Sequence, residues 1–468
     1  MPSPAVWHGC PVRAEAVYHR APYPIRVGLA SARGVLLSAR RYGRDHEDLV
    51  AQALEREFWT TTDWQTWQDE QVDRLLQSAR SNVPAYGALP AAVGVGAQAL
   101  AGLPLLSKEQ LRSAPRSFLR DDAPRSLVAE HTSGSTGTPL TLWISRQDYR
   151  AWYALAEARW RRWYGVSRHD RWAIVGGQAI VAPDTTTPPY WVWNAAMHQL
   201  YLSSYHVADT TAAAYALAMD HHRVTYLLGY PSSIHALAVA CQRQGVRPRP
   251  LRVVVANAEP VLDYQRAVIS EVFGCAVRET YGMAEYVTAA SECDHGSMHL
   301  WPEAGVLEVV SQDSSDQVAP GTTGRFVATG LVNTSMPLIR YLVGDAGALA
   351  PAGTTCGCGR TLPILAGIEG RNDDLIRTPD GRLIGRLDPV FKEDLPIRGA
   401  QIIQEELDRF RVLVVPGDGY GPEAERIIST RLRDRVGDVR VTFESVETLP
   451  LGPNGKFKAV VSHVPGGA

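Results

Sequence analysis

The chain has 468 residues, of which 45% are hydrophobic and 21% are charged. These fractions are typical of globular proteins and exclude a disordered or fibrous chain. Its 47 Lys and Arg residues nearly balance its 49 Asp and Glu residues, which leaves a net charge of −2. Because binding to nucleic acid or to an anionic membrane usually requires a basic field, we expect neither partner. The length allows about three domains at ~150 residues each, or two unequal domains of a large α/β enzyme.

Six cysteines in so long a chain are too few for a disulfide framework, and they indicate a reducing compartment. The first eight residues lack the basic region followed by an apolar region that a signal peptide requires. No uninterrupted apolar stretch approaches the ~18 residues of a membrane span. We therefore expect a soluble, cytoplasmic protein.

The first part of the chain has the pattern of helices joined by loops. A helix is predicted over residues 63–76, where apolar side chains lie near one face: Trp64, Trp67, Leu75 and Leu76. We interpret its two tryptophans as core packing. A second helix is predicted over residues 147–164, because aromatic residues recur there at three- and four-residue steps. Three arginines should form its exposed face: Arg159, Arg161 and Arg162.

From residue 171 onward, short β-rich runs alternate with helical patterns. Strands are predicted at residues 172–175, 225–228, 251–256 and 276–280, and helices at 232–244 and 263–273. This alternation is typical of βαβ units in a parallel sheet that is covered on both faces. Beyond residue 305 strands dominate, at residues 305–310, 324–329 and 338–341.

A domain boundary is predicted near residues 370–374, before a polar turn segment. The residues after it have a short α+β pattern, with strands at 411–415, 439–443 and 457–461 and a helix at 421–435. The fold class is therefore α/β, with a large N-terminal domain over residues 1–370 that holds a βαβ parallel sheet and additional β structure. Residues 371–468 would form a small α+β domain.

One segment combines two glycines with several hydroxyl side chains, and its members are Thr132, Ser133, Gly134, Ser135, Thr136, Gly137 and Thr138. Glycine allows a close approach of the backbone, while N–H groups and hydroxyls supply donors, so the loop could wrap a polyphosphate. It is not a Walker A loop, because no Lys follows the second glycine. Predicted strands at residues 126–130 and 140–144 flank it, which leaves a polar hairpin turn as the alternative.

Three further polar clusters follow strands or interrupt loops, at residues 256–260, 279–285 and 341–345. In a parallel sheet, ligands bind outside the carboxyl ends of the strands, where the first two clusters would lie side by side. Singly, Glu259 or Glu285 would most often be a solvated loop carboxylate. Their positions directly after successive predicted strands favour a ligand site.

A metal site is predicted from Cys293, His299, Cys356 and Cys358. Two cysteines one residue apart, together with a Cys–His pair elsewhere, could close a tetrahedral Cys₃His zinc site. Its shell would be full, so its role would be structural rather than catalytic. His295 is a competing ligand, and four unliganded residues in loops are the alternative.

The order of these motifs resembles the adenylate-forming superfamily of acyl- and aryl-CoA synthetases, peptide-synthetase adenylation domains and luciferases. The resemblance implies an ATP site, with the 132–139 loop on the phosphates, although Thr138 stands where a Lys is usual. It implies that Tyr281 flanks the adenine, that Glu285 binds Mg²⁺ and that Asp345 holds the ribose hydroxyls. Other residues of the matched motifs would line the nucleotide: Ala258, Glu259, Pro260, Glu279, Gly282, Met283 and the hinge residue Arg371.

By the same resemblance, residues 453–458 are like the C-terminal Gly-Lys motif, so Lys456 would be the catalytic lysine of a mobile C-terminal domain. The enzyme would let a carboxylate attack the ATP α-phosphate, which forms an acyl-adenylate and releases pyrophosphate. The carboxylate needs no base at neutral pH, so catalysis would rest on positioning and charge stabilisation.

Within the superfamily the chain is more similar to the phenylacetate-CoA ligase-like branch, including relatives from capsular polysaccharide gene clusters. Some members of this branch carry zinc at a similar Cys/His arrangement. One segment differs, because residues 377–384 replace the Arg-Gly-x-Asn-Val/Ile-Phe-Pro run of true aryl-CoA ligases. CoA is the first acceptor that we consider, because this branch includes CoA ligases. Because the run is missing, an amine or a carrier-protein thiol in a biosynthetic pathway is the alternative.

A non-catalytic nucleotide- or zinc-binding module is a third hypothesis. The joint retention of Lys456, Glu285 and Asp345 argues against it. The acid itself is not readable from the sequence. An aromatic-rich middle region would suit an aryl acid, and from it we take Tyr230 and Trp193 as substrate-binding candidates, with ordinary packing as the alternative.

Overall fold

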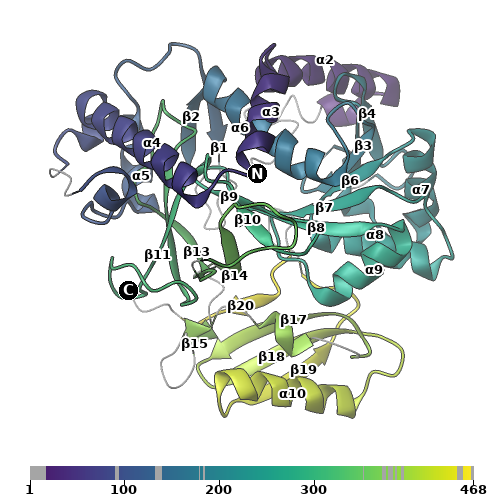
Figure 1. Cartoon of the computed structure of the whole chain (residues 1–468). Coiled ribbons are helices and arrows are strands. Elements are labelled where there is room, and N and C mark those ends of the chain that lie inside the picture. The colour runs from purple at the N-terminus through teal and green to yellow at the C-terminus, as the bar shows by residue number, and fades with distance from the viewer. Residues whose placement is uncertain are drawn as a thin grey trace.

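A twelve-stranded mixed sheet organises the large domain (Figure 1). The computed structural model describes residues 17–89, 94–131, 140–178, 180–182, 185–351, 353–371, 376–377, 383–384, 387–391, 395–450 and 457–464. The sheet has the strand order β11-β12-β13-β14-β10-β9-β8-β7-β6-β3-β5-β4. Five neighbouring strands are parallel: β5 (Gln199–Ser203), β3 (Trp172–Gly176), β6 (Tyr226–Gly229), β7 (Val253–Asn257) and β8 (Ala276–Gly282).

Antiparallel strands extend this parallel core on both sides. β4 (Trp191–Asn194) closes one edge. On the other side follow β9 (Ala289–Glu292), β10 (Met298–Leu300), β14 (Ile364–Arg371), β13 (Tyr341–Leu349), β12 (Gly324–Gly330) and β11 (Gly305–Val310). The predicted parallel sheet with additional β structure is therefore confirmed. β4, β5, β9, β10 and β14 were not predicted as strands, because they are short or lack a clear alternation.

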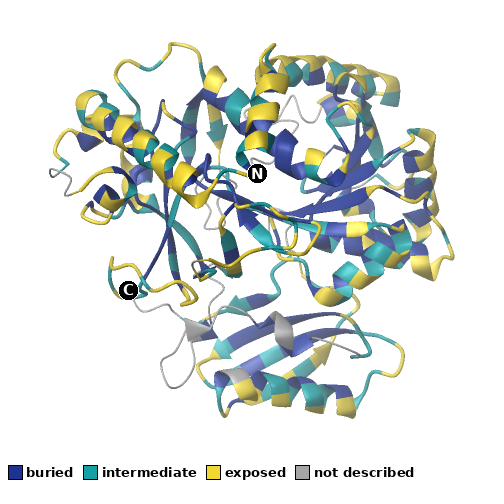
Figure 2. Ribbon diagram, viewed as in Figure 1, coloured by how far each residue is buried: buried dark blue, intermediate teal, exposed yellow. Residues whose placement is uncertain are grey.

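Both faces of the parallel core are covered. Successive side chains of β7 point to opposite faces of the sheet, and both sets are buried. Val254 and Ala256 point into the cluster that contains α7 (Ala212–His221), α8 (Pro231–Arg243) and α9 (Asp263–Phe273). Val253 and Val255 point into the opposite cluster, which includes Ala30 of α2 (Tyr23–Arg41). Buried residues accordingly fill the strands, while the outer helix faces are exposed (Figure 2).

The remaining helices of the large domain are α3 (His46–Arg56), α4 (Thr61–Asn82), α5 (Lys108–Ser113) and α6 (Arg146–Trp160). α4 contains the predicted helix 63–76 and begins with a capping box, in which Thr60 and Asp63 exchange hydrogen bonds. Of the two tryptophans predicted to pack in the core, Trp64 is buried and Trp67 is only partly buried. Among the described helices none is long and apolar enough to cross a membrane.

The three arginines at the end of α6 and directly after it contradict the expected exposed face. Arg159 is fully buried and Arg161 is only 5% exposed. Arg159 forms a bidentate ion pair with Glu303 at 2.8 and 2.9 Å, and Arg161 pairs with Glu157 at 3.2 Å. Arg162 stays partly exposed and reaches Glu47. The error arose because the carboxylate that pairs with Arg159 comes from a distant part of the chain.

The C-terminal domain has its own sheet, with the order β19-β18-β17-β20, and lies below the large domain in Figure 1. Its elements are β17 (Ile397–Glu406), β18 (Arg409–Pro416), α10 (Pro422–Val436), β19 (Arg440–Ser445) and β20 (Val460–Ser462), preceded by the short pair β15 (Ile376–Arg377) and β16 (Leu383–Ile384). Phe410, Val412, Ile428 and Leu432 belong to a separate core. The sequence missed β17, because Gln401 and Gln404 interrupt its apolar pattern although both are buried.

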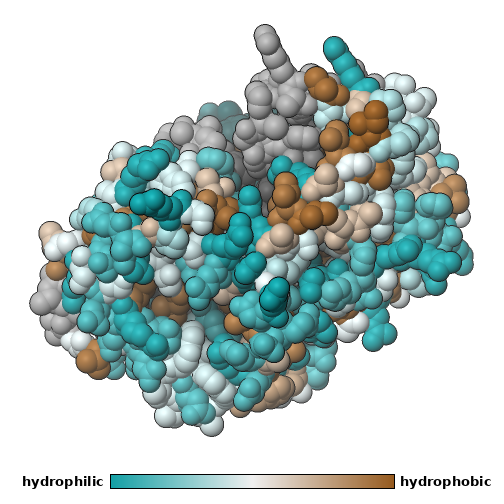
Figure 3. All heavy atoms as spheres, turned by 90° about the horizontal axis from the view of Figure 1, so that it is seen from above, coloured by the Kyte–Doolittle hydropathy of each residue, from teal (hydrophilic) through white to brown (hydrophobic). Residues whose placement is uncertain are grey.

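Exposed large apolar residues concentrate at the start of the described chain. Hydrophobic residues gather on the upper face of the molecule (Figure 3), and five exposed ones belong to α2 or precede it: Val17, Ile25, Leu29, Val35 and Leu36.

Candidate functional site

The strands β1 (Leu127–His131) and β2 (Thr141–Ser145) frame the loop that was predicted to bind phosphate. They pair antiparallel, with His131 opposite Thr141, and the two side chains are hydrogen-bonded at 3.1 Å. The flanking strands are thus confirmed. The loop residues Thr132, Ser133, Gly134, Ser135, Thr136, Gly137 and Thr138 lie outside the described residues, so their phosphate contacts stay a prediction.

Two predicted nucleotide residues meet directly. The hydroxyl of Tyr281, near the end of β8, donates a 2.7 Å hydrogen bond to the carboxylate of Asp345 in β13. Gly344 has a φ of +87°, a conformation that an L-residue rarely adopts, and it directly precedes Asp345. Asp345 is also the register partner of Arg371 across β13 and β14, although the Arg371 side chain lies outside the described residues.

Glu285, the predicted magnesium ligand, is 7% exposed. Tyr341 donates a 3.1 Å hydrogen bond to its carboxylate, and Lys108 Nζ lies 3.9 Å away. Lys108 is the first residue of α5, and the sequence analysis missed it. Its only sequence signal is the capping pattern of Ser107 and Gln110, which predicts a helix start but not a cation beside Glu285.

Two of the motif carboxylates adjoin strained backbone. Ala258 has a φ of +67° and precedes Glu259, while Tyr286 has a φ of +59° and follows Glu285. Non-glycine residues seldom occupy this left-handed region, and such positions concentrate at ligand sites because the surrounding structure enforces them. Two of the five described non-glycine residues with positive φ thus lie beside these motif carboxylates.

Glu259 contacts protein groups from both domains. Its carboxylate accepts hydrogen bonds from the backbone N–H and the hydroxyl of Ser232, both at 3.1 Å, and from the backbone N–H of Phe457 at 2.7 Å. Ser232 lies in the first turn of α8, where the helix dipole favours an anion. Lys456, which precedes Phe457 in the chain, lies outside the described residues, so its catalytic role stays a prediction.

The other residues of the matched motifs occupy the same strand end but point to different neighbours. Glu279 lies 3.9 Å from Arg266. Gly282 ends β8, and Met283 packs against an apolar cluster that includes Val287. Pro260 and Ala258 flank Glu259 in the segment after β7.

The two substrate-binding candidates are not neighbours. Tyr230 is 8% exposed and caps α8 directly after β6. Burial, with a contribution from the Glu259 charge, raises the pKa of Tyr230 to about 12. Trp193 lies in the edge strand β4, separated from β6 by β5 and β3, and stacks on His222 at 4.6 Å. The structure therefore places only Tyr230 beside the nucleotide motifs.

The predicted metal residues converge. The ligand atoms of Cys293, His299, Cys356 and Cys358 all lie within 4.8 Å of one another. Cys293 Sγ is 3.6 Å from Cys356 Sγ, and Cys358 Sγ is 3.3 Å from His299 Nε2. His299 Nδ1 bonds the Leu362 carbonyl at 3.1 Å, which directs Nε2 toward the sulfurs. The residue types, the number of ligands and the spacing fit zinc.

The thiols of this Cys₃His cluster differ in their tendency to ionise. Burial raises the pKa of Cys293 to about 12. Burial acts in the same direction on Cys356, but hydrogen bonds, the largest from the Cys358 backbone, outweigh it and lower the pKa of Cys356 to about 6.

His295 is half exposed, pairs with Asp294 and lies outside the four-residue cluster. The geometry therefore favours His299 over His295.

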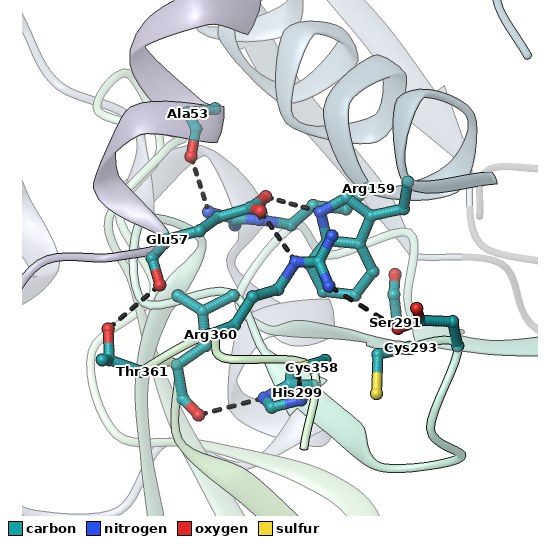
Figure 4. A network of polar contacts seen from close by, with 12 residues as sticks. Ala53, Glu57, Arg159, Ser291, Cys293, His299, Cys358, Arg360 and Thr361 are labelled. Atoms are coloured by element: carbon teal, nitrogen blue, oxygen red, sulfur yellow. Dashed lines mark hydrogen bonds and ion pairs between the residues drawn. The ribbon is translucent and has the colours of Figure 1, made fainter. Parts of the chain in front are cut away.

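A buried ion network connects this cluster to the N-terminal helices (Figure 4). Glu57, directly after α3, accepts a 2.9 Å hydrogen bond from Arg360 and lies 3.5 Å from Arg159. Trp163 donates to the same carboxylate at 2.6 Å, and its ring packs edge-on against His299. Arg360 follows the Cys356–Cys358 loop by two residues, so this loop and the helices α3 and α6 share one polar network.

Comparisons with known proteins agree with these motifs. Residues 70–335 match the family model described as AMP-binding enzyme, and residues 376–463 match the CapK C-terminal domain. Protein CapK of Staphylococcus aureus is 21% identical, over 96% of this chain and 99% of that protein. The phenylacetate-coenzyme A ligase of Thermus thermophilus is 26% identical, over 66% of this chain and 70% of that protein.

Among solved structures, 2-hydroxyisobutyryl-CoA ligase in the postadenylation state superposes with a TM-score of 0.69. The alignment covers 87% of this chain and 91% of that one at 20% identity. This likeness shows that the two chains share the fold, including a separate C-terminal domain.

Proposed function

Because this chain belongs to the AMP-binding enzyme family, a family of adenylate-forming ligases, we propose that it activates a carboxylic acid with ATP and transfers the acyl group to a thiol or an amine. The observation that carries the proposal is the convergence of Tyr281 with Asp345 and of Lys108 and Tyr341 with Glu285. These residues come from β8, β13, α5 and the segment after β8. Their convergence supports a nucleotide site better than it supports a set of solvated loops.

In the proposed first step, a carboxylate oxygen of the acid attacks the α-phosphorus of ATP. The bond from this phosphorus to the bridging oxygen breaks, and pyrophosphate leaves with its electron pair. No proton needs to move, so the protein contributes positioning and charge stabilisation. Asp345 would hold the ribose hydroxyls, Tyr281 would flank the adenine, and Lys456 would stabilise the charge on the α-phosphate.

Glu285 is the residue we propose as a Mg²⁺ ligand. Mg²⁺ prefers carboxylate and phosphate oxygens and, when bound, would neutralise charge on the phosphates. The 3.9 Å approach of Lys108 supplies a second positive group at the same carboxylate. Lys108 is therefore our candidate for a phosphate contact, in place of the Lys that Thr138 replaces in the sequence of the loop.

For the second step we propose CoA as the acceptor. The Thermus relative and the 2-hydroxyisobutyryl-CoA ligase are both named as CoA ligases, which supports this choice. The altered segment at residues 377–384 keeps an amine or a carrier-protein thiol as the second candidate. Each acceptor would attack the acyl carbon of the adenylate and release AMP.

We also propose that the Cys₃His cluster holds one structural zinc ion. Four protein ligands would fill its shell and leave no position for a reacting water. The cluster would hold the loop at Cys356–Cys358 against β10 and would contribute to folding, not to chemistry.

The function is tested with a panel of aliphatic, hydroxylated and aromatic acids, by measuring pyrophosphate release with ATP and Mg²⁺. Acid-dependent release would support the proposal, and its absence with every acid would contradict it. With the best acid, AMP release is then measured with CoA, an amine or a phosphopantetheinylated carrier added as the acceptor. The comparison decides between CoA and the alternative acceptors.

A further inference from the structure

Glu259 joins the two domains through one carboxylate. The bond from Phe457 N–H, at 2.7 Å, links the C-terminal domain to a residue of the large domain. The Ser232 bonds fix the same carboxylate to the first turn of α8. Glu259 is 8% exposed, so these bonds lie largely out of water.

The hydrogen bonds of the Glu259 carboxylate suit a side chain that binds protein N–H groups rather than a nucleotide. Three donors point at one carboxylate, and two of them are backbone N–H groups, which cannot move independently of their elements. Hydrogen bonds to an ionised carboxylate are about twice as strong as neutral ones. The +67° φ of Ala258 shows that the backbone is constrained where it presents this side chain.

A second contact lies beside the first. The Tyr264 hydroxyl of α9 is 4.0 Å from the position that a Cβ would take at Gly399 in β17. Burial, with a contribution from the Glu259 charge, raises the pKa of Tyr264 well above its usual value. Glu259 and Tyr264 thus belong to one region of domain contact, at the carboxyl end of β7.

We infer that Glu259 is a positioning residue for adenylation: it anchors the chain at Phe457, next to Lys456, and is not a ligand of ATP. This inference rests on the proposed function. Because Lys456 directly precedes Phe457, the bond would limit how far the lysine backbone can move from the large domain. The bond must break if the C-terminal domain rotates for the second step, so its loss should slow the first step alone.

The inference is tested with two variants that act on the bond from opposite sides. Glu259→Gln keeps an acceptor oxygen but removes the charge and so weakens the bond, and Phe457→Pro removes the N–H donor while leaving Glu259 intact. Phe457→Leu is the matched control, because it changes the side chain and keeps the N–H. Pyrophosphate release measures the first step, and acyl transfer from supplied adenylate measures the second.

We expect Glu259→Gln and Phe457→Pro to lower kcat for pyrophosphate release about 10- to 100-fold, as for loss of a charge-assisted hydrogen bond. KM for ATP and the rate of acyl transfer should change by less than about threefold. Phe457→Leu should lose at most a few-fold in kcat. A large rise in KM for ATP in Glu259→Gln, with no effect of Phe457→Pro, would make Glu259 an ATP ligand and overturn the inference.

A measurement without substrates separates this inference from the proposed function. In the sequence, trypsin sites follow the predicted domain boundary at Arg377, Arg382, Arg386 and Lys392. If the bond anchors the C-terminal domain, Glu259→Gln and Phe457→Pro should both be cleaved there several-fold faster than the unaltered chain and Phe457→Leu. Equal cleavage rates in all four proteins would contradict the anchor, even if no acid is ever adenylated.

Discussion

The Tyr281 hydroxyl donates a 2.7 Å hydrogen bond to the Asp345 carboxylate, which joins two strands that are not neighbours in the main sheet. β9, β10 and β14 lie between β8 and β13 in the strand order, so the bond crosses a curved part of the sheet. The side chain proposed to flank the adenine therefore also orients the side chain proposed to hold the ribose.

This relationship predicts different effects for two substitutions. Asp345→Ala should raise KM for ATP by about 10- to 100-fold, because a charged acceptor is lost from the ribose site. Tyr281→Phe keeps the ring and loses only the bond to Asp345, so it should raise KM for ATP by less. Steady-state kinetics at saturating acid measure both, and an unchanged KM in Asp345→Ala would remove Asp345 from the nucleotide site.

The zinc proposal predicts about one tightly bound zinc ion per chain. Cys356→Ser or Cys358→Ser should lose both the metal and thermal stability, because binding free energy at a closed site is folding free energy. Cys275→Ser is the matched control, since Cys275 lies outside the cluster. His299→Ala should lose zinc and His295→Ala should keep it. Elemental analysis that finds no metal in protein purified without chelators would end this proposal.

The ion pair between Arg159 and Glu303 predicts a large stability effect. Both residues are buried, so Arg159→Ala would leave the Glu303 carboxylate without its bidentate partner, while Glu57 keeps its bond from Arg360. Breaking one partner of a buried pair typically costs about 3–5 kcal/mol. Arg426→Ala is the control, because its side chain and that of its partner Glu423 are 67% and 70% exposed, and exposed ion pairs contribute about 0–1 kcal/mol. Denaturant unfolding should rank the two variants in this order, and equal losses would contradict the account.

The sequence predicted the architecture of the parallel core, because β-branched runs and helical periods alternate clearly over residues 171–280. It also identified the Cys₃His cluster and the strands that flank the 132–138 loop, since spacing and residue type are local signals. It could not predict that Lys108 lies beside Glu285 or that Arg159 is buried. Both facts depend on ion pairs with carboxylates that are distant in the sequence, and no local pattern encodes such pairs.

The role of Glu259 illustrates the same limit at the site. Its motif predicted the correct strand end, and the position after β7 is as expected. Three hydrogen-bond donors among the described residues, however, belong to Ser232 and Phe457, which only the packing of α8 and of the C-terminal domain brings together. Motif and spacing therefore predicted the strand end at which Glu259 lies, while tertiary contacts decide which groups its carboxylate meets there.

The central claim is that this chain forms an acyl-adenylate with the help of Lys456. The direct measurement is acid-dependent exchange of labelled pyrophosphate into ATP, with the unaltered chain and with Lys456→Ala compared at equal zinc content and equal thermal stability. Loss of one transition-state donor costs roughly 2.7–4 kcal/mol, so exchange should fall by about 10²–10³ while ATP still binds. An exchange rate in Lys456→Ala equal to that of the unaltered chain would contradict the account.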